Sequence, residues 1–555
     1  MAKTKNNFLS GAIVLTLCSL LTKVIGAIYK IPLLKTLGSD GLGAYQMILS
    51  IFALFLVICS GGIVVALSKL VSVQVAYHNK SNQKKYLLSA LLITALFSVF
   101  LAVVLASLSG VLSTYQGLNF GKACYFALIP TLIASAVTSV FRGYFLGKKQ
   151  MLTSGVVNVF EAVCKLVFSL GLSVFFARKN SFLAVFGAIL GLAISEVFTF
   201  LFCIAIYFCL GKKFKTKLCG TLKILCGKAY KKVCNKCCTK NFCNLHAKNR
   251  YIGLKTATKQ IFNISIFVTL QACIVPLISA IDGLIVVPLI AKTGLSRPIC
   301  CSLFGIEDGI ITSLVAMPTI ISSSVGSAII PNIRANASDS TATKQNVFNA
   351  IKIVWLASIF CAFVFIFFSR DIIQFLYAGG LSANRLDEFL ISADLLKING
   401  FNVIYLSLLG LSGSILQGLD RPKIPLISMV IALPVRYAVL LFCLTKSYIN
   451  IYGLAFADMA FYVVSLLLNF AKIKRICGVK FLLLKTFALP VFCCGVIMLV
   501  MWLIKRVTIS VLPFKIDVAL VMLVGACLYF ALLSLVGSLN IKGSVNAILK
   551  KRQQI

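Results

Sequence analysis

The chain has 555 residues, of which 60% are hydrophobic and only 12% are charged, and its formal net charge is +40. Soluble domains average roughly 45–50% apolar and about 25% charged residues, so this composition excludes an ordinary soluble enzyme, a disordered chain and a fibrous repeat. With a mean hydropathy of +1.01, the chain has the composition of a membrane protein, and its cations are first considered as loop charges rather than as a nucleic-acid-binding surface.

Long apolar runs extend from near the N-terminus almost to the C-terminus. A helix needs about 20 apolar residues to cross the roughly 30 Å hydrocarbon core, and backbone groups in lipid must be satisfied within the segment. We therefore predict an all-α polytopic membrane protein with about 14 transmembrane helices. The predicted spans are residues 9–33, 44–68, 87–111, 123–141, 156–177, 182–210, 261–290, 306–330, 349–369, 391–417, 424–445, 451–471, 486–504 and 516–538.

The Lys and Arg residues outside these spans are distributed unequally between the two sides of the membrane. The side that holds the N-terminus and every second loop has 36 of them, and the alternate loops have 12. Cytoplasmic loops carry an excess of Lys and Arg. We therefore expect both termini to be cytoplasmic, as an even number of spans requires, in the plasma membrane of a bacterial cell.

One large hydrophilic insertion, residues 211–260, follows the sixth span and contains no acidic residue. Cys234, Cys237, Cys243 and His246 in it have a spacing that could supply zinc ligands. The alternative is a flexible basic loop on anionic lipid headgroups, where each Lys contributes about 1 kcal/mol. We favour the second interpretation, in which no metal is bound.

Three pairs of similar segments, separated by 256 to 275 residues, indicate an internal duplication. They predict two six-helix lobes related by an axis along the membrane normal, with a substrate path between them. The expected domains are an N-lobe (1–210, helices 1–6), the basic loop (211–260), a C-lobe (261–475, helices 7–12), and helices 13–14 with a basic tail (476–555).

Two lysines lie seven residues apart in the first span, Lys23 and Lys30. Seven residues are close to two helical turns, so both belong to one face. A Lys facing lipid at mid-depth is unfavourable by roughly 2.5–3.5 kcal/mol, so we expect this face to line a hydrated cavity, although Lys30 could instead reach the outer surface. Together with Arg334 and Arg436, such a cavity favours an anionic headgroup, for which phosphate is a natural candidate.

Acidic residues in the spans are candidates for cation coupling or for ion pairs. Asp282 lies in a proline-interrupted helix, where a carboxylate could bind a proton or another cation; pairing with a lobe cation is the equal alternative. Glu161 and Lys165 form an i,i+4 pair that could neutralise itself, and Asp40 joins this group. Two further acids are expected at the outer mouth, Glu307 and Asp308.

The sequence does not favour an enzyme. No Ser/His/Asp arrangement, metal triad or paired-carboxylate motif is evident, and both histidines fall in predicted loops. The P-loop pattern is also absent, so we expect no cofactor. Any driving force would be a gradient of protons or sodium ions, the membrane potential or a downstream sink.

Several segments resemble the polysaccharide-biosynthesis branch of the multidrug/oligosaccharidyl-lipid/polysaccharide (MOP) exporter superfamily, and above all its stage V sporulation protein B group, relatives of the MurJ lipid II flippases. The segments belong to both predicted lobes. They are LTKVIGAIYKIP (21–32), LGSDGLGAYQ (37–46), VALSKLV (65–71), RGYF (142–145) and ILQG (415–418).

This resemblance implies a V-shaped, two-lobed transporter that works by alternating access and moves a polyprenyl-pyrophosphate-linked saccharide, such as a peptidoglycan precursor, from the inner to the outer leaflet. It also implies that Lys23 and Lys30 correspond to functional cations of the first helix. The chain departs from the MurJ pattern by having Lys where Arg is used, which weakens bidentate phosphate recognition, and by lacking a cation in the middle of the second helix.

Two other functions stay open from the sequence. A cation-coupled drug antiporter of the MATE type would prefer an anionic cavity, which the lysines of the first helix disfavour. A non-transporting membrane protein of cell-envelope or spore assembly would have no use for buried lysines on one face. The expected partners are a lipid-linked saccharide, membrane lipids and a coupling proton or sodium ion, and no nucleic acid.

Overall fold

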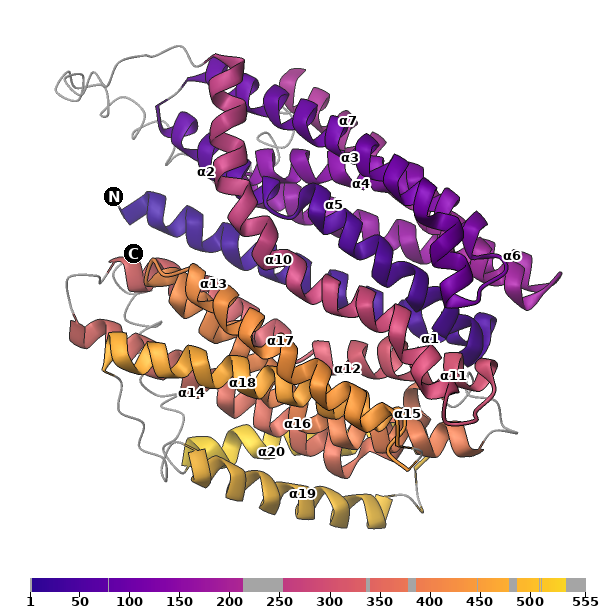
Figure 1. Cartoon of the computed structure of the whole chain (residues 1–555). Helices are drawn as coiled ribbons and strands as arrows, with labels where there is room; N and C mark the ends of the chain where they lie inside the picture. The colour runs from indigo at the N-terminus through magenta and orange to yellow at the C-terminus, as the bar shows by residue number, and fades with distance from the viewer. Residues whose placement is uncertain are drawn as a thin grey trace. The chain divides into compact units, whose positions relative to one another are not determined.

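The computed structural model describes residues 2–77, 79–212, 253–335, 340–377, 386–446, 448–478, 487–508, 510 and 512–535, and every regular element among them is a helix (Figure 1). The helices up to residue 212 are α1 (Ala2–Ser60), α2 (Ile63–Ala76), α3 (Lys80–Gln116), α4 (Gly121–Gly147), α5 (Met151–Cys164), the π-helix η1 (Lys165–Ser169), α6 (Leu170–Ala177) and α7 (Ser181–Lys212).

The remaining helices begin at residue 254. They are α10 (Leu254–Ala291), α11 (Arg297–Phe304), the π-helix η2 (Gly305–Ile311), α12 (Thr312–Ala316), α13 (Thr319–Ala335), α14 (Ser340–Phe367), α15 (Ser369–Tyr377), α16 (Leu386–Gly418), α17 (Lys423–Leu444), α18 (Tyr452–Cys477), α19 (Leu489–Thr508) and α20 (Phe514–Leu535).

Thirteen helical stretches in the described residues are long and apolar enough to cross a membrane. The first, Leu17–Val75, contains 59 residues and covers most of the first two predicted spans. The predicted span 306–330 is broken near Pro318, where α12 ends and the short apolar α13 begins. The all-α, multi-span architecture predicted from the sequence is therefore confirmed.

The chain folds into two compact units. Unit 1 comprises residues 1–25, 48–172 and 186–280, and unit 2 comprises residues 26–47, 173–185 and 281–555. The chain passes between the units within α1, α6, α7 and α10. The predicted division into an N-lobe (1–210) and a C-lobe (261–475) stays a prediction.

The α1 helix bends at Gly38, whose φ of 70° lies in the left-handed region. Glycine adopts this conformation without the steric penalty that a Cβ atom would cause. Tyr29 precedes the bend and Tyr45 follows it, and their hydroxyl oxygens lie 3.2 Å apart. The bend therefore fixes how the segment of α1 that belongs to unit 2 folds against itself.

Helices of unit 1 approach closely at glycines. Cβ atoms on Gly143 and Gly147 of α4 would lie 2.9 and 3.0 Å from the backbone oxygens of Val64 and Ser68 in α2. A small-xxx-small pair of this kind allows two membrane helices to pack backbone to backbone. The RGYF segment of the sequence thus has a packing role, because its glycine faces α2.

Unit 2 has a similar contact, in which the part of α1 after Gly38 packs against α11 and the start of η2. A Cβ on Gly43 would overlap the backbone of Cys301, and a Cβ on Gly305 would lie 2.6 Å from the backbone oxygen of Ser39. Neither position can hold a larger residue without separating the helices. This contact positions η2, and with it the acidic residues Glu307 and Asp308, beside α1.

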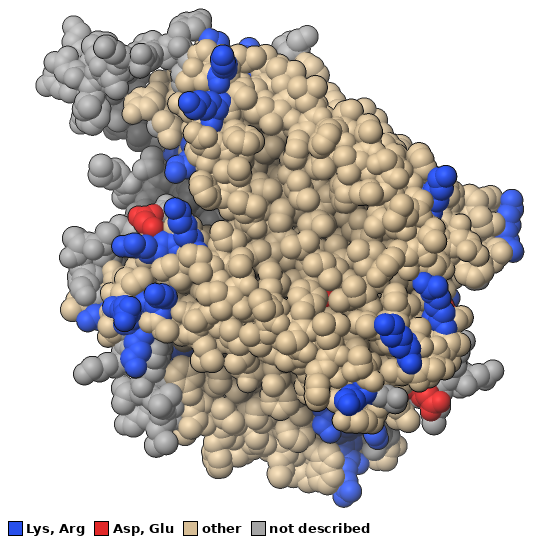
Figure 2. All heavy atoms as spheres, in the orientation of Figure 1, with Lys and Arg blue, Asp and Glu red and all other residues tan. Residues whose placement is uncertain are grey.

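On the face drawn in Figure 2, Lys and Arg side chains gather near the ends of helices and the surface between them is largely uncharged. Large apolar side chains such as Leu96, Val103 and Ile431 are exposed along the middles of helices. An uncharged band with many exposed aliphatic and aromatic groups is the surface that lipid requires.

Candidate functional site

Arg436 of α17 is a buried cation of unit 2 and is 1% exposed. Its Nη1 and Nη2 donate to Oδ1 and Oδ2 of Asp282 in α10 at 2.9 and 2.6 Å, and its Nε donates to Oδ1 of Asp458 in α18 at 2.9 Å. The guanidinium also lies over the ring of Tyr437, 5.2 Å from its centroid. Bidentate pairing of this kind is the strongest hydrogen-bonded form of an ion pair.

Lys30 of α1 meets the π-helix η2. Its Nζ donates to the backbone oxygen of Gly309 at 2.9 Å and to Oγ of Ser313 at 2.5 Å. A π-helix bonds i to i+5 and disturbs the regular backbone ladder, so a carbonyl is available to a side chain. Asp308 interacts with Lys30 electrostatically, but the described residues place no carboxylate within ion-pairing distance of this ammonium.

Glu307 of η2 is buried next to two asparagines of α16. Asn399 Nδ2 donates to Glu307 Oε1 at 2.9 Å, and Asn402 Nδ2 donates to Asn399 Oδ1 at 2.8 Å and to the backbone oxygen of Ala455 at 3.0 Å. Glu307 Oε2 and Asn402 Oδ1 are buried and accept no hydrogen bond from the described residues. The Glu307 side chain is enclosed by protein, because the residue is 1% exposed; its expected place at the outer mouth stays a prediction.

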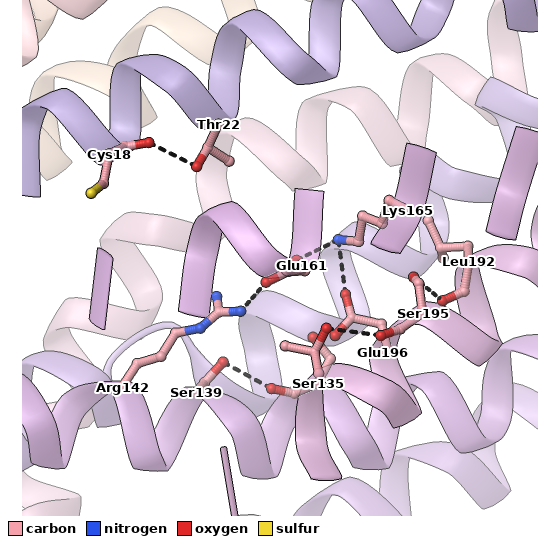
Figure 3. A network of polar contacts seen from close by, with 11 residues as sticks. Cys18, Thr22, Ser135, Ser139, Arg142, Glu161, Lys165, Leu192, Ser195 and Glu196 are labelled. Atoms are coloured by element: carbon pink, nitrogen blue, oxygen red, sulfur yellow. Dashed lines mark hydrogen bonds and ion pairs between the residues drawn. The ribbon is translucent and has the colours of Figure 1, made fainter. Parts of the chain in front are cut away.

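Unit 1 contains a second network of charges, which joins α4, α5, η1 and α7 (Figure 3). Arg142 donates to Glu161 Oε2, and Lys165 Nζ lies 2.5 Å from Glu161 Oε1 and 2.8 Å from Glu196 Oε1. Two cations and two carboxylates therefore alternate, and the network is balanced in charge. The i,i+4 pair expected from the sequence forms, as one part of a larger arrangement.

Sequence reasoning misses part of this network. It places Arg142 in a loop after a helix that ends at residue 141, whereas α4 continues to Gly147 and Arg142 points toward Glu161. Glu196 falls inside the predicted span 182–210, and the sequence indicates no partner for it. One sequence signal could have identified the pair of Arg142 and Glu161. A basic residue lies within one helical turn of the predicted end of a helix, and an acidic residue lies in the following helix.

The remaining candidate residues are dispersed. Lys23 is exposed on α1, and the described residues give its ammonium no hydrogen bond or ion pair. Asp40 follows the bend in α1, where Ser39 Oγ lies 3.4 Å from its Oδ1. Arg334 lies in the last turn of α13, and its side chain is outside the described residues, as are Cys234, Cys237, Cys243 and His246.

The geometry defines a multi-pass membrane protein with charged networks inside two helical units. The family model for polysaccharide biosynthesis proteins matches residues 8–336, more than half of the chain, and the chain belongs to this family. Stage V sporulation protein B of Bacillus subtilis (strain 168) is 22% identical over 500 residues, which cover 89% of each chain. Lipid II flippase MurJ of the same organism is 26% identical over 174 residues, covering 30% of this chain and 32% of that protein.

Solved structures show the same fold. A lipid II flippase MurJ in an inward closed conformation has a TM-score of 0.65 and 14% identity, and the match covers 94% of this chain and 99% of that chain. An inward-facing multidrug resistance MATE family transporter of the MOP superfamily has a TM-score of 0.60 and 13% identity, covering 85% and 100%. The membership of the MOP superfamily predicted from the sequence is confirmed, in the polysaccharide-biosynthesis branch of these membrane transporters and flippases.

Proposed function

We propose that this protein is a flippase that moves a polyprenyl-pyrophosphate-linked saccharide, a peptidoglycan precursor or a related oligosaccharide lipid, from the inner to the outer leaflet by alternating access. It acts in the bacterial plasma membrane with both termini in the cytoplasm. The family of polysaccharide biosynthesis proteins and the likeness to stage V sporulation protein B and to MurJ support this function.

The observation that carries the proposal is the state of the two lysines on α1. Arg142, Lys165 and Arg436 are each paired with carboxylates. Lys23 has no such partner among the described residues, and Lys30 is held only by a carbonyl and a hydroxyl. These two ammonium groups are therefore the intramembrane cations of this set whose charge is available to an anionic ligand.

Their chemistry fits a pyrophosphate. An ammonium group binds phosphate oxygens as a point charge, and neutral acceptors can be exchanged for phosphate without separating an ion pair. Arg334 is a further candidate contact. Arg436 can bind the pyrophosphate only in a state that releases it from Asp282 and Asp458, because its guanidinium N–H groups already donate to these two carboxylates.

The test is flipping in reconstituted vesicles. Fluorescent lipid-linked saccharides are placed in one leaflet, and a membrane-impermeant quencher reports their transfer. We expect Lys23→Gln and Lys30→Gln each to slow transfer by at least tenfold, since each removes a charge that meets the headgroup. Lys35→Gln is the matched control, because Lys35 lies on the same helix and is exposed.

All three variants must reach the membrane and elute as monodisperse protein. Wild-type transfer rates in Lys23→Gln and Lys30→Gln would contradict the assignment of the two lysines. No transfer of any polyprenyl-linked saccharide by the wild-type protein would contradict the proposed function itself.

A further inference from the structure

Lys30 and two groups of unit 2 form a closed ring of hydrogen bonds. Lys30 Nζ donates to the backbone oxygen of Gly309 at 2.9 Å and to Ser313 Oγ at 2.5 Å. Ser313 Oγ in turn donates to the same Gly309 oxygen at 2.8 Å. A serine hydroxyl has one hydrogen and two lone pairs. Because that hydrogen is directed to Gly309, Ser313 acts on the Lys30 ammonium as an acceptor.

The ring is internal to unit 2. Lys30 belongs to the segment 26–47 of α1, and both of its acceptors belong to the segment that begins at residue 281. After its bend, α1 contacts η2 a second time, where Gln46 Nε2 donates to the backbone oxygen of Asp308 at 3.1 Å. Two consecutive carbonyls of the π-helix, those of Asp308 and Gly309, thus accept from side chains of one helix. The ring therefore does not depend on where unit 1 lies.

The acceptors in this ring are neutral, unlike the partners of other intramembrane cations. Arg436 and Lys165 each meet two carboxylates, whereas Lys30 meets a carbonyl and a hydroxyl. A phosphate oxygen adds the attraction of opposite charges to the hydrogen bond that it accepts from an ammonium. A phosphate can therefore displace the neutral acceptors of Lys30, and the ring can form again when the phosphate leaves.

The ring is also open to an incoming ligand. Lys30 and Ser313 are both partly exposed. An ammonium has three N–H donors, and the third has no partner among the described residues. A phosphate can meet this N–H first and then replace the ring acceptors. An internal contact that is present only in the ligand-free state lowers the apparent affinity for the ligand, so the ring opposes tight binding of the phosphate.

We propose that Ser313 is a positioning residue that promotes release of the pyrophosphate of the cargo, because it gives Lys30 a neutral acceptor in the empty state. A flippase must release its cargo as well as bind it, and the ring is the arrangement to which Lys30 returns. The role in release rests on the proposed transport function. The competition between Ser313 and a phosphate for Lys30 does not, so it can be tested without any lipid-linked cargo.

The first experiment measures binding of inorganic pyrophosphate to the purified protein in detergent at a fixed salt concentration. The part of the binding that Lys30→Gln removes is the signal. Ser313→Ala removes the competing acceptor, and we expect its dissociation constant for pyrophosphate to fall roughly three- to tenfold, as the loss of one hydrogen bond implies. Ser313→Thr keeps the hydroxyl and should bind pyrophosphate as the wild type does.

Ser324→Ala is the matched control. Ser324 Oγ donates to the backbone oxygen of the residue four positions earlier at 2.8 Å, as Ser313 Oγ does, and the described residues give it no hydrogen bond from a lysine. We expect pyrophosphate binding in this variant to equal that of the wild type. Ser313→Cys, whose thiol is a weak acceptor, is a second variant in case Ser313→Ala does not fold, and it should also tighten binding.

A double variant shows whether Ser313 acts through Lys30. In the Lys30→Gln background, Ser313→Ala should leave the remaining pyrophosphate binding unchanged, because no ammonium is present for the hydroxyl to hold. A merely structural role of Ser313 would instead weaken binding in both backgrounds. Weaker or unchanged binding in Ser313→Ala and Ser313→Cys would overturn the proposal, and so would tighter binding that persists without Lys30.

Flipping measurements test the role in release. For fluorescent lipid-linked saccharides, we expect Ser313→Ala to lower KM and to lower kcat as well, since a headgroup that is bound more tightly leaves more slowly. A lowered KM with a wild-type kcat would overturn the role in release. No transfer of saccharide by the wild-type protein would contradict the proposed function, whereas the competition at Lys30 would still be decided by the pyrophosphate measurements.

Discussion

Arg436 shows how much depends on a single buried side chain. Its guanidinium joins α17 to α10 and α18 through two carboxylates, and it is almost completely enclosed. Removing one partner from a buried ion pair is costly because the remaining charge stays in a medium that solvates it poorly. The strength of the arrangement therefore depends on keeping all three groups.

We expect Arg436→Met to destabilise the protein by about 3–5 kcal/mol, because two carboxylates lose their common cation. Thermal unfolding in detergent, followed by fluorescence-detected size exclusion, measures the loss. The double variant Asp282→Asn with Arg436→Met should recover part of it, since one of the stranded charges is then absent. A single variant as stable as the wild type would contradict this account.

The candidate residues can be predicted from the sequence, but their partners cannot. Ionisable residues stand out in apolar runs because they are costly in lipid, and Asp282 and Arg436 are recognised on this basis. Their pairing spans 154 positions along the chain, and it depends on tertiary packing that no local pattern records. The burial of Glu307 is not predicted either, because nothing in the sequence marks the π-helix η2 that contains this residue.

At the scale of the helices, the sequence predicts the number of spans better than their ends. The number follows from the hydrocarbon thickness, which any apolar run must match. A predicted span stops at the first cation, whereas α4 passes Arg142 because Glu161 neutralises it. The bend at Gly38 is not predicted either, since two spans with a short connection look the same in sequence as one helix with a kink.

The contact between α1 and η2 gives a prediction about two glycines of one helix. Gly43→Ala should destabilise the protein by about 1–3 kcal/mol, because the added Cβ overlaps the backbone of Cys301, which cannot rotate away as a side chain could. Gly26→Ala meets no atom within 4 Å. It should be neutral or stabilise by about 0.4–1 kcal/mol through reduced backbone freedom.

Thermal unfolding and yield of monodisperse protein compare the two glycine variants directly. The expected order of stability is Gly26→Ala, wild type, Gly43→Ala. Equal stabilities for the two variants would mean that α1 and α11 can separate without cost, contrary to the close backbone contact.

The bend itself makes a separate prediction. A residue with a side chain at the φ of Gly38 is strained even where space is available, and no atom lies within 4 Å of the position. Gly38→Ala should therefore cost about 1–3 kcal/mol, and Gly38→Asn should cost about as much, because φ 70° with ψ 174° is a conformation that is essentially confined to glycine. Thermal melts of the two variants measure this loss, and a melting temperature equal to that of the wild type in either variant would argue against the kink.

For the whole molecule, the unequal distribution of cations predicts the topology. A green fluorescent protein fused after residue 555 should be fluorescent, because we expect the C-terminus in the cytoplasm. An alkaline phosphatase inserted between α17 and α18, after Lys446, should be active on the opposite side. As a control, each reporter is placed at the other position, where it should be inactive. A fluorescent protein that stays dark after residue 555, together with an active phosphatase there, would require both termini to lie outside.

The two charge networks differ in their response to the membrane potential. The four groups of unit 1 sum to zero, so displacing them together through the field requires no net electrical work. Arg436 and its two carboxylate partners comprise one cation and two acids, and a net charge moved across the whole membrane experiences about 2.3 kcal/mol per 100 mV. We therefore expect movement of the Arg436 cluster in unit 2 to respond to the membrane potential, and joint movement of the four charged groups in unit 1 not to respond.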